Sequence, residues 1–249
     1  MIKEAELIKT LESGAQYRET ISPQSSNLSL LTCGRYELSP SVSTSSLVFP
    51  QKETLLFCME GEGEILIDKK SYPIKHYDAI YIPQRKRHII KNNSGENLVL
   101  ASFRAQGKEE VSVIHSSFKK ISSDKKRIRK LKGKDVYIMF GEDEGAQNLT
   151  GGYTFFEPFS RSWPIHLHED QEEIYLFIKG HGAMEVFENE EKKTFVKEVK
   201  EGDAVTIPME NYHPVFSFDK ELHFIWVIAG ARYWVGDKDK SFIETAKKD

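Results

Sequence analysis

Short runs rich in Val, Ile, Phe and Tyr recur along the whole chain, and Gly, Pro, Asn and Asp separate them at short intervals. This alternation of apolar runs and turn residues is typical of β-strands. Examples are TLLFCMEG, GEILID and DAIYIP in the first half and EEIYLFIKG, AMEVFE and DAVTIP in the second. Only EAELIKTLES, near the N-terminus, has helical character. The pattern therefore predicts an all-β chain, folded as a sandwich or barrel.

The second half of the chain repeats the pattern of the first. TLLFCMEGEGEILI matches EEIYLFIKGHGAMEVF, which places Gly61 opposite Gly180. YDAIYIPQRKRH matches GDAVTIPMENYH, which places Pro83 opposite Pro208. Because 249 residues can supply two modest cores, we expect two copies of one β unit.

A polar connection followed by the basic run DKKRIRKLKGKD separates the two copies. Such a run is more often a solvated linker or sheet edge than a binding site, and the acidic GEDEG that follows partly balances it. We place the boundary near Ile121. The sequence thus predicts an N-terminal extension over residues 1–27, a first barrel over 28–120 and a second barrel over 121–249.

Charge and composition exclude several classes of protein. The net charge of −3 does not resemble the positive field of a nucleic-acid binder. No apolar stretch approaches the roughly 20 residues needed to span a membrane, and the N-terminus lacks the apolar core of a signal peptide. We expect a cytoplasmic protein without nucleic-acid or membrane partners. Cys33 and Cys58 lie in apolar stretches, so any metal must rely on His and carboxylate ligands.

Four residues of the second copy have the character of metal ligands. His166 and His168 are two apart, so an extended strand points both imidazoles to one face. Glu173 follows after a stretch long enough for a tight turn, and His213 comes soon after Pro208 ends a later strand. Three imidazoles and one carboxylate can bind Zn, Mn, Fe, Ni or Co and leave a position open for substrate. We expect one divalent metal ion here.

The matching positions of the first copy have lost their ligands. Thr54 stands at the position of the carboxylate, and Leu47 and Phe49 stand at those of the first two histidines. Only His88 remains of the set. Glu53 is one residue out of register and would face the other side of its strand. The first barrel is therefore expected to be a scaffold without metal.

The spacing HxHxxxxE, then GxxxxxP and a further His, resembles the cupin superfamily. This resemblance implies two tandem double-stranded β-helix (jelly-roll) barrels, with the metal inside the second. EGDAVTIPMENYHPV, LHFIWVIAG and KGKDVYIMF look like the uronate isomerases, a family that contains 5-deoxy-glucuronate isomerase and 4-deoxy-5-ketouronate isomerase. The resemblance implies aldose–ketose isomerisation of a deoxy-uronate sugar acid, in inositol or uronate catabolism. The 5-deoxy-glucuronate isomerase carries a long insertion after its HxH, where this chain has only EDQE. The resemblance therefore does not identify the substrate.

Other residues must then move protons, because Glu173 is committed to the metal. Alternation puts Tyr175 and Lys179 on the face of Glu173, and we predict these two as catalytic residues. Arg161 and Tyr212 are predicted to bind the substrate. The alternatives are core packing for Tyr175 and surface charges for Lys179 and Arg161.

Two other functions stay open at this stage. One is a metal-dependent, quercetinase-like cupin dioxygenase, and the other is a non-catalytic sugar-binding bicupin. Assembly into a homo-oligomer is also left open by the sequence.

Overall fold

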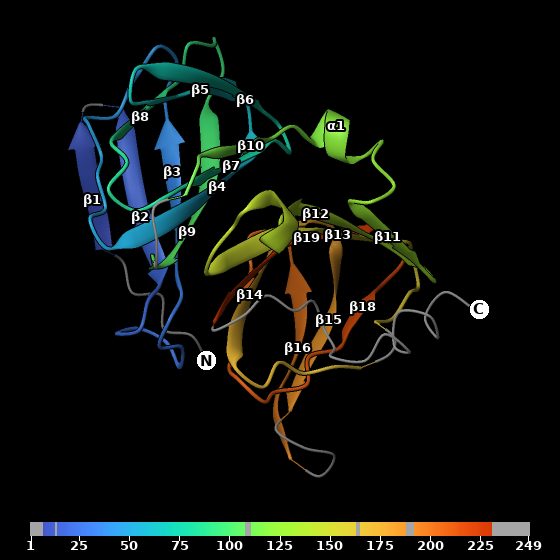
Figure 1. Cartoon of the computed structure of the whole chain (residues 1–249). Helices are drawn as coiled ribbons and strands as arrows, with labels where there is room; N and C mark the ends of the chain where they lie inside the picture. The colour runs from blue at the N-terminus through green and yellow to red at the C-terminus, as the bar shows by residue number, and fades with distance from the viewer. Residues whose placement is uncertain (1–6, 13, 108–110, 163–164, 188–191, 231–249) are drawn as a thin grey trace. The chain divides into compact units, whose positions relative to one another are not determined.

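The computed structural model describes residues 7–12, 14–107, 111–162, 165–187 and 192–230, and nearly all of them are strands and turns (Figure 1). The helices within these ranges are single short turns, α1 (Phe118–Ile121) and the 3-10 helix η1 (Glu142–Glu144). Neither is long and apolar enough to cross a membrane. The prediction of an all-β chain is confirmed.

The chain divides into two compact units. The first contains the described residues up to Ile121 together with Phe140–Leu149. The second contains Ser122–Met139 and the described residues from Thr150 onward. The chain therefore passes from the first unit to the second, returns to the first for one segment, and leaves it again.

The N-terminal segment differs from its expected conformation. Leu7–Glu12 forms strand β1, so the expectation of helix is wrong for these residues. β1 pairs with β2 (Ala15–Ile21), and β2 pairs with β3 (Thr32–Leu38). Pairing with a neighbouring strand overrides a weak local preference for helix in so short a segment. Much of the expected extension is thereby part of the sheet of the first unit.

The first unit consists of two antiparallel sheets. The larger has the order β1-β2-β3-β9-β4-β7-β10, and the smaller has the order β6-β5-β8. Their remaining strands are β4 (Lys52–Glu60), β5 (Glu62–Ile67), β6 (Lys70–Lys75), β7 (Ala79–Ile82), β8 (His88–Lys91), β9 (Leu98–Gln106) and β10 (Ile114–Ser116).

The second unit repeats this arrangement. Its larger sheet has the order β11-β12-β13-β19-β14-β17, and its smaller sheet has the order β16-β15-β18. The strands are β11 (Ile128–Leu131), β12 (Lys134–Phe140), β13 (Leu149–Phe156), β14 (Gln171–Lys179), β15 (His181–Phe187), β16 (Lys193–Lys200), β17 (Ala204–Ile207), β18 (Val215–Ser217) and β19 (Leu222–Gly230). The run β3-β9-β4-β7 matches β13-β19-β14-β17, and β6-β5-β8 matches β16-β15-β18. The repeat seen in the sequence is thus a repeat of topology, as two tandem cupin barrels require.

Apolar side chains from both sheets fill the interior of each unit. In the first unit Leu56, Ile65 and Leu100 are fully buried members of this core. In the second, Phe177 and Met184 occupy the same kind of position. Because alternate residues of each strand point inward, these cores also fix which polar side chains share the interior face.

The two glycines that the repeat aligns, Gly61 and Gly180, have the same role in a turn between two strands. Gly61 has a φ of 76° and Gly180 a φ of 83°, a region that L-residues with side chains rarely adopt. A Cβ at Gly61 would collide with the backbone oxygen of Asn97, and a Cβ at Gly180 with that of Glu221. The turn between β4 and β5, like that between β14 and β15, therefore requires glycine.

Glu53 lies on the face of β4 that points away from the interior, as its register predicts. Its carboxylate is buried and accepts hydrogen bonds from the Tyr81 hydroxyl at 2.8 Å and from the backbone N–H groups of Asn148 (2.9 Å) and Leu149. The ring of Phe140 packs against the same face. Segment Phe140–Leu149 therefore covers this side of the sheet and satisfies a buried charge within the first unit.

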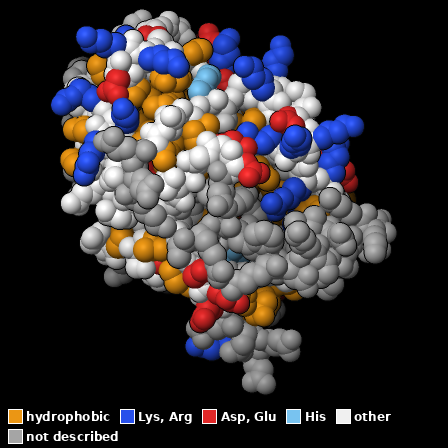
Figure 2. Space-filling view, viewed as in Figure 1, with side chains coloured by type: hydrophobic (Ala, Val, Ile, Leu, Met, Phe, Trp, Pro, Cys, Tyr) orange, Lys and Arg blue, Asp and Glu red, His pale blue; other side chains and the backbone are white. Residues whose placement is uncertain are grey.

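The basic run forms β11 and the turn into β12, at the edge of the six-stranded sheet. Lys130 on this edge is exposed and lies 4.0 Å from the carboxylate of Asp135. On the face shown in Figure 2, Lys and Arg side chains are interspersed with Asp and Glu side chains. Charged residues on an edge strand discourage pairing with other chains.

Candidate metal centre

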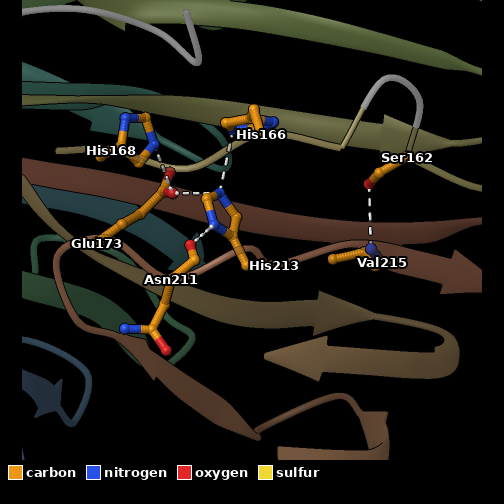
Figure 3. A network of polar contacts seen from close by, with 7 residues as sticks. All are labelled: Ser162, His166, His168, Glu173, Asn211, His213 and Val215. Carbon is orange, nitrogen blue, oxygen red and sulfur yellow. Dashed lines mark hydrogen bonds and ion pairs between the residues drawn. The ribbon is translucent and has the colours of Figure 1, made fainter. Parts of the chain in front are cut away.

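Three elements bring the four predicted ligands together in the second unit (Figure 3). His166 and His168 lie in the irregular segment that leads into β14, Glu173 lies on β14, and His213 lies just before β18. The expected strand for the two histidines is not formed, but their side chains still reach one place. The candidate ligand atoms of all four residues lie within 4.8 Å of one another.

The distances within this group are those of donors that converge on one point. Glu173 Oε2 lies 3.2 Å from His168 Nε2 and 3.1 Å from His213 Nε2. His213 Nε2 also lies 3.1 Å from His166 Nε2. The Nδ1–H of His213 donates to the backbone carbonyl of Asn211 at 2.9 Å, so the neutral ring turns its Nε2 lone pair inward.

Lone pairs that converge in this way repel one another unless a cation lies between them. The His213 lone pair faces both the Glu173 carboxylate and the imidazole of His166. His168, Glu173 and His213 are buried, and His166 is half-buried. Three imidazole nitrogens and one carboxylate oxygen therefore fit a divalent metal ion with an open position.

The electrostatics of Glu173 agree with a ligand role. Burial alone would raise the pKa of its carboxyl, but the hydrogen bonds and positive charge that His168 and His213 supply when they carry protons outweigh burial and lower this pKa, and a cation held among the same nitrogens would favour the carboxylate in the same way. Glu173 is consequently an anion at neutral pH, as a metal ligand must be.

Ser162 holds the segment before the ligands in place. Its hydroxyl accepts a hydrogen bond from the Val215 N–H at 3.1 Å, and its own N–H donates to the Val215 carbonyl at 2.8 Å. Val215 begins β18, two residues after His213. The two hydrogen bonds between Ser162 and Val215 therefore join the chain before His166 to the chain after His213 (Figure 3). Sequence reasoning did not single out Ser162 or Asn211.

Of the predicted non-metal residues, Tyr175 lies beside the ligands, and Tyr212 adjoins them only along the chain. The ring centroid of Tyr175 is 5.7 Å from that of His213 and 4.4 Å from that of Phe224. Burial, together with the charge of Glu173, raises the pKa of the Tyr175 phenol well above its usual value. Tyr212 adjoins His213 in the chain, and its ring stacks on Phe187 with centroids 5.3 Å apart.

The other two lie elsewhere. Lys179 is exposed and forms an ion pair with Glu221 at 2.8 Å. It follows Glu173 by six positions on β14, about 20 Å along a strand, which exceeds the reach of its side chain. Arg161 is also exposed, and its guanidinium lies 4.8 Å above the ring of Phe216. The structure does not bring either residue to the four ligands, and their roles stay predictions that the geometry does not favour.

Lys134, at the start of β12, is a cation near the centre that sequence reasoning missed. Its Nζ lies 5.3 Å from the ring centroid of Phe156, a core residue of this unit. Burial lowers the pKa of Lys134 to about 8, and the negative charge of Glu173 opposes that effect. Its signal was the alternation of Lys134, Val136 and Ile138, which places the ammonium on the face of two apolar residues that pack in the core.

Three further histidines lie outside the centre. His181 pairs with Asp219 at 3.1 Å, and the ring of His223 stacks on Phe155 with centroids 3.8 Å apart. His76 stacks on its neighbour Tyr77. Within the described part of the chain, the four ligands form the one group of three or more His, Cys, Asp or Glu suited to a metal.

Comparison with known proteins finds one family model that matches nearly the whole chain. The model of the KduI/IolB family matches residues 7–245. An IolB-like protein from Salmonella typhimurium LT2 is similar in structure, with a TM-score of 0.76, 19% identity, and 91% of this chain and 94% of that chain covered. No curated protein sequence matches the chain.

Two further solved structures share the fold. A putative glyoxylate-induced protein from Pseudomonas aeruginosa has a TM-score of 0.71 and 13% identity, with 91% of this chain and 84% of that chain covered. A variant of oxalate decarboxylase from Bacillus subtilis has a TM-score of 0.75 and 16% identity, with 98% and 85% covered. At such identities the likeness concerns the fold alone.

Proposed function

The chain belongs to the KduI/IolB family, and from this premise we propose that it is a metal-dependent isomerase of a deoxy-uronate sugar such as 5-deoxy-glucuronate. The family consists of isomerases of uronate and inositol catabolism. The observation that carries the proposal is the convergence of His166, His168, Glu173 and His213 on one point within a matching chain. Oxalate decarboxylase is similar at only 16% identity, so its likeness concerns the fold and carries no activity to this chain.

The four converging residues would hold the metal ion. A divalent ion in such an open site supplies polarisation of carbonyl and hydroxyl oxygens, which acidifies the carbon–hydrogen bond between them. The backbone carbonyl of Asn211 keeps the proton of His213 on Nδ1. The hydrogen bond between Ser162 and Val215 holds the chain before His166 against the start of β18. The chain's own part is thus to fix the direction of every ligand before substrate arrives.

We assign the transfer of the proton to Lys134, whose ammonium interacts electrostatically with the Glu173 carboxylate. A partly buried amine whose pKa lies near 8 exchanges its proton readily near neutral pH. In the proposed reaction the carbon–hydrogen bond breaks, the proton passes to Nζ, and the electron pair stays on the sugar. The same proton, or one from solvent, then returns to the neighbouring carbon, while the hydroxyl proton passes from its oxygen to the former carbonyl oxygen, so that the product is an isomer and no oxidant or reductant is consumed.

Tyr175 takes a different part in this proposal. Because its phenol stays protonated at neutral pH, it can donate a hydrogen bond to a substrate oxygen but cannot remove a proton. Tyr212, half-buried beside His213, is the second candidate contact for the sugar. Lys179 is not assigned a part, because its ammonium is paired with Glu221 in solvent.

The experiment is proton NMR of the metal-loaded protein in D₂O, with 5-deoxy-glucuronate and 4-deoxy-5-ketouronate as separate substrates. We expect isomer to form from one of them, with deuterium at the carbon that gains a proton. Binding without turnover of either would favour a sugar-binding bicupin instead. Oxygen uptake with a flavonoid, in the absence of isomerisation, would favour a dioxygenase.

A further inference from the structure

The ligand end of the first barrel carries a buried cation where the second barrel carries metal donors. Glu173 pairs across the sheet with Ile228 in the second unit, whereas Thr54 pairs with Arg104 at the matching place in the first. The carboxylate is lost at one position and a guanidinium is gained at its neighbour. Arg104 shares the inward face of β9 with core residue Leu100.

The guanidinium of Arg104 is buried without a carboxylate partner among the described residues. Its side chain lies between two rings, 4.6 Å from the centroid of Tyr17 and 4.2 Å from that of Phe49. One of its amino groups donates to the Tyr36 hydroxyl at 3.3 Å, while its Nε–H has no partner. Arg104 is only 6% exposed, and a buried charge of this kind is costly unless an anion joins it.

Neighbouring polar groups are unpartnered as well. The Tyr17 hydroxyl is buried with no hydrogen bond. His88 is 1% exposed, its Nδ1 faces the Lys86 carbonyl at 3.3 Å, and its Nε2 has no partner. Burial, and to a lesser degree the charge of Arg104, keeps the pKa of His88 near 4, so its Nε2 is an acceptor.

We propose that the first barrel binds a small hydroxycarboxylate, with its carboxylate on Arg104 and a hydroxyl on His88. The guanidinium fork and the Tyr17 hydroxyl are donors, which suits a carboxylate. The His88 Nε2 is an acceptor, which suits a ligand hydroxyl and disfavours a second anionic group. The side chain of Phe49 lies over the guanidinium and near the His88 ring, and it is half-exposed, so movement of one ring would admit the ligand.

The test uses the full chain with His168→Ala, so that the metal centre does not contribute, and D-glucuronate as the probe in isothermal titration calorimetry. We expect one molecule to bind per chain. Adding Arg104→Met should weaken binding at least about tenfold, and Arg104→Lys should weaken it less, because lysine keeps the charge but not the fork. Arg35→Met is the matched control, since Arg35 is exposed and paired with Glu37.

Thermal unfolding without the probe separates this role from a structural one. Removal of an uncompensated buried charge should leave the melting temperature of Arg104→Met unchanged or higher. A marked fall would mean that the guanidinium serves to hold the two rings together and would overturn the proposal. So would glucuronate binding that Arg104→Met does not change, absence of binding to the His168→Ala chain, or equally tight binding of acetate or inorganic phosphate.

Discussion

Lys134 can serve this site through its charge or through its proton, and two substitutions separate the alternatives. Lys134→Met should lower kcat/KM by about 100-fold, because it removes a group that acts in the transition state. Lys134→Arg keeps the charge but cannot act as a base, so it should be nearly as inactive as Lys134→Met. Recovery of activity in Lys134→Arg would show that the cation only anchors the substrate.

Lys130→Met is the control for these kinetics, because Lys130 is the exposed lysine of the same β-hairpin. Lys179→Met tests the prediction from sequence directly. An unchanged kcat/KM in Lys179→Met agrees with its place in solvent, whereas a large loss would restore it to the reaction.

His88 should make the stability of the fold depend on pH. Its pKa is about 4 in the folded protein and 6.5 when unperturbed, so the unfolded chain takes up the proton first as the pH falls. Stability is therefore lost between pH 6.5 and about 4, by about 3 kcal/mol at most. His88→Leu should remove this part of the loss.

The measurement is urea unfolding at several pH values in the His168→Ala background, which should hold little metal, so that pH-dependent metal binding contributes little to the slope. His181→Leu, at an exposed histidine, is the control and should leave the slope unchanged. Equal slopes for His88→Leu and its parent would contradict the assignment.

At the scale of single residues, the sequence predicted the metal ligands better than it predicted the other side chains around them. Residue type and spacing together identify the four ligands, because metal coordination constrains both. These ligands are His166, His168, Glu173 and His213. Lys134 lies far ahead of Glu173 in a run of surface cations, and only the pairing of β12 into the sheet places it near the centre. The structure places Lys179 at the far end of β14 from Glu173, because alternation gives the face of a strand but not the distance along it.

At the scale of elements, the turn between β14 and β15 offers a clean test of glycine. Gly180→Ala meets a strained φ and also the backbone oxygen of Glu221, so the free energy of unfolding should fall by about 2 kcal/mol or more. Gly202→Ala meets a similar φ of 92° but open space, and should cost only about 1 kcal/mol. Urea unfolding of both variants measures the difference, and equal losses would mean that the contact is unimportant.

The order of the strands followed from the repeat, but the edges of the sheets did not. Matched glycines and prolines aligned the two copies, and the matched strand orders agree with that alignment. β1 takes the place in its sheet that β11 takes in the second unit, but it lies outside the segments that the sequence repeat aligned, and its residues fit a helix as well as a strand. Its partner β2 decides the matter, which is information that a local pattern does not carry.

At the scale of the whole molecule, we expect one tightly bound divalent ion per chain, since the described part of the first unit offers no second ligand group. Elemental analysis of the purified protein should give a ratio near one, and His168→Ala should lose most of the metal. The melting temperature of the metal-loaded protein should fall with it, because an ion that binds only the folded state stabilises it.

His181→Ala is the matched control for metal content, because His181 is a histidine of the same unit that pairs with Asp219 instead. Two tightly bound ions per chain would show that the first unit also holds metal. One ion that survives His168→Ala would mean that the ligands lie elsewhere.

We predicted a boundary near Ile121 from the polar connection and the basic run, whereas the first structural unit also includes Phe140–Leu149 beyond it. What composition could not show is the return of Phe140–Leu149 to the first unit, because this depends on the buried carboxylate of Glu53. A hydrogen bond between residues so far apart leaves no mark on either local sequence.

Segment Phe140–Leu149 sets the order in which the two units can fold during translation. A nascent chain that ends at residue 121 has made every strand of the first barrel, yet the amides of Asn148 and Leu149 that Glu53 requires have not been synthesised. N-terminal domains usually fold first during translation, but here that step must wait for the opening strands of the second barrel. A gene fragment cut at the apparent boundary would therefore encode a first barrel that lacks two of the donors to its buried Glu53 carboxylate, and the remaining fragment would carry those donors.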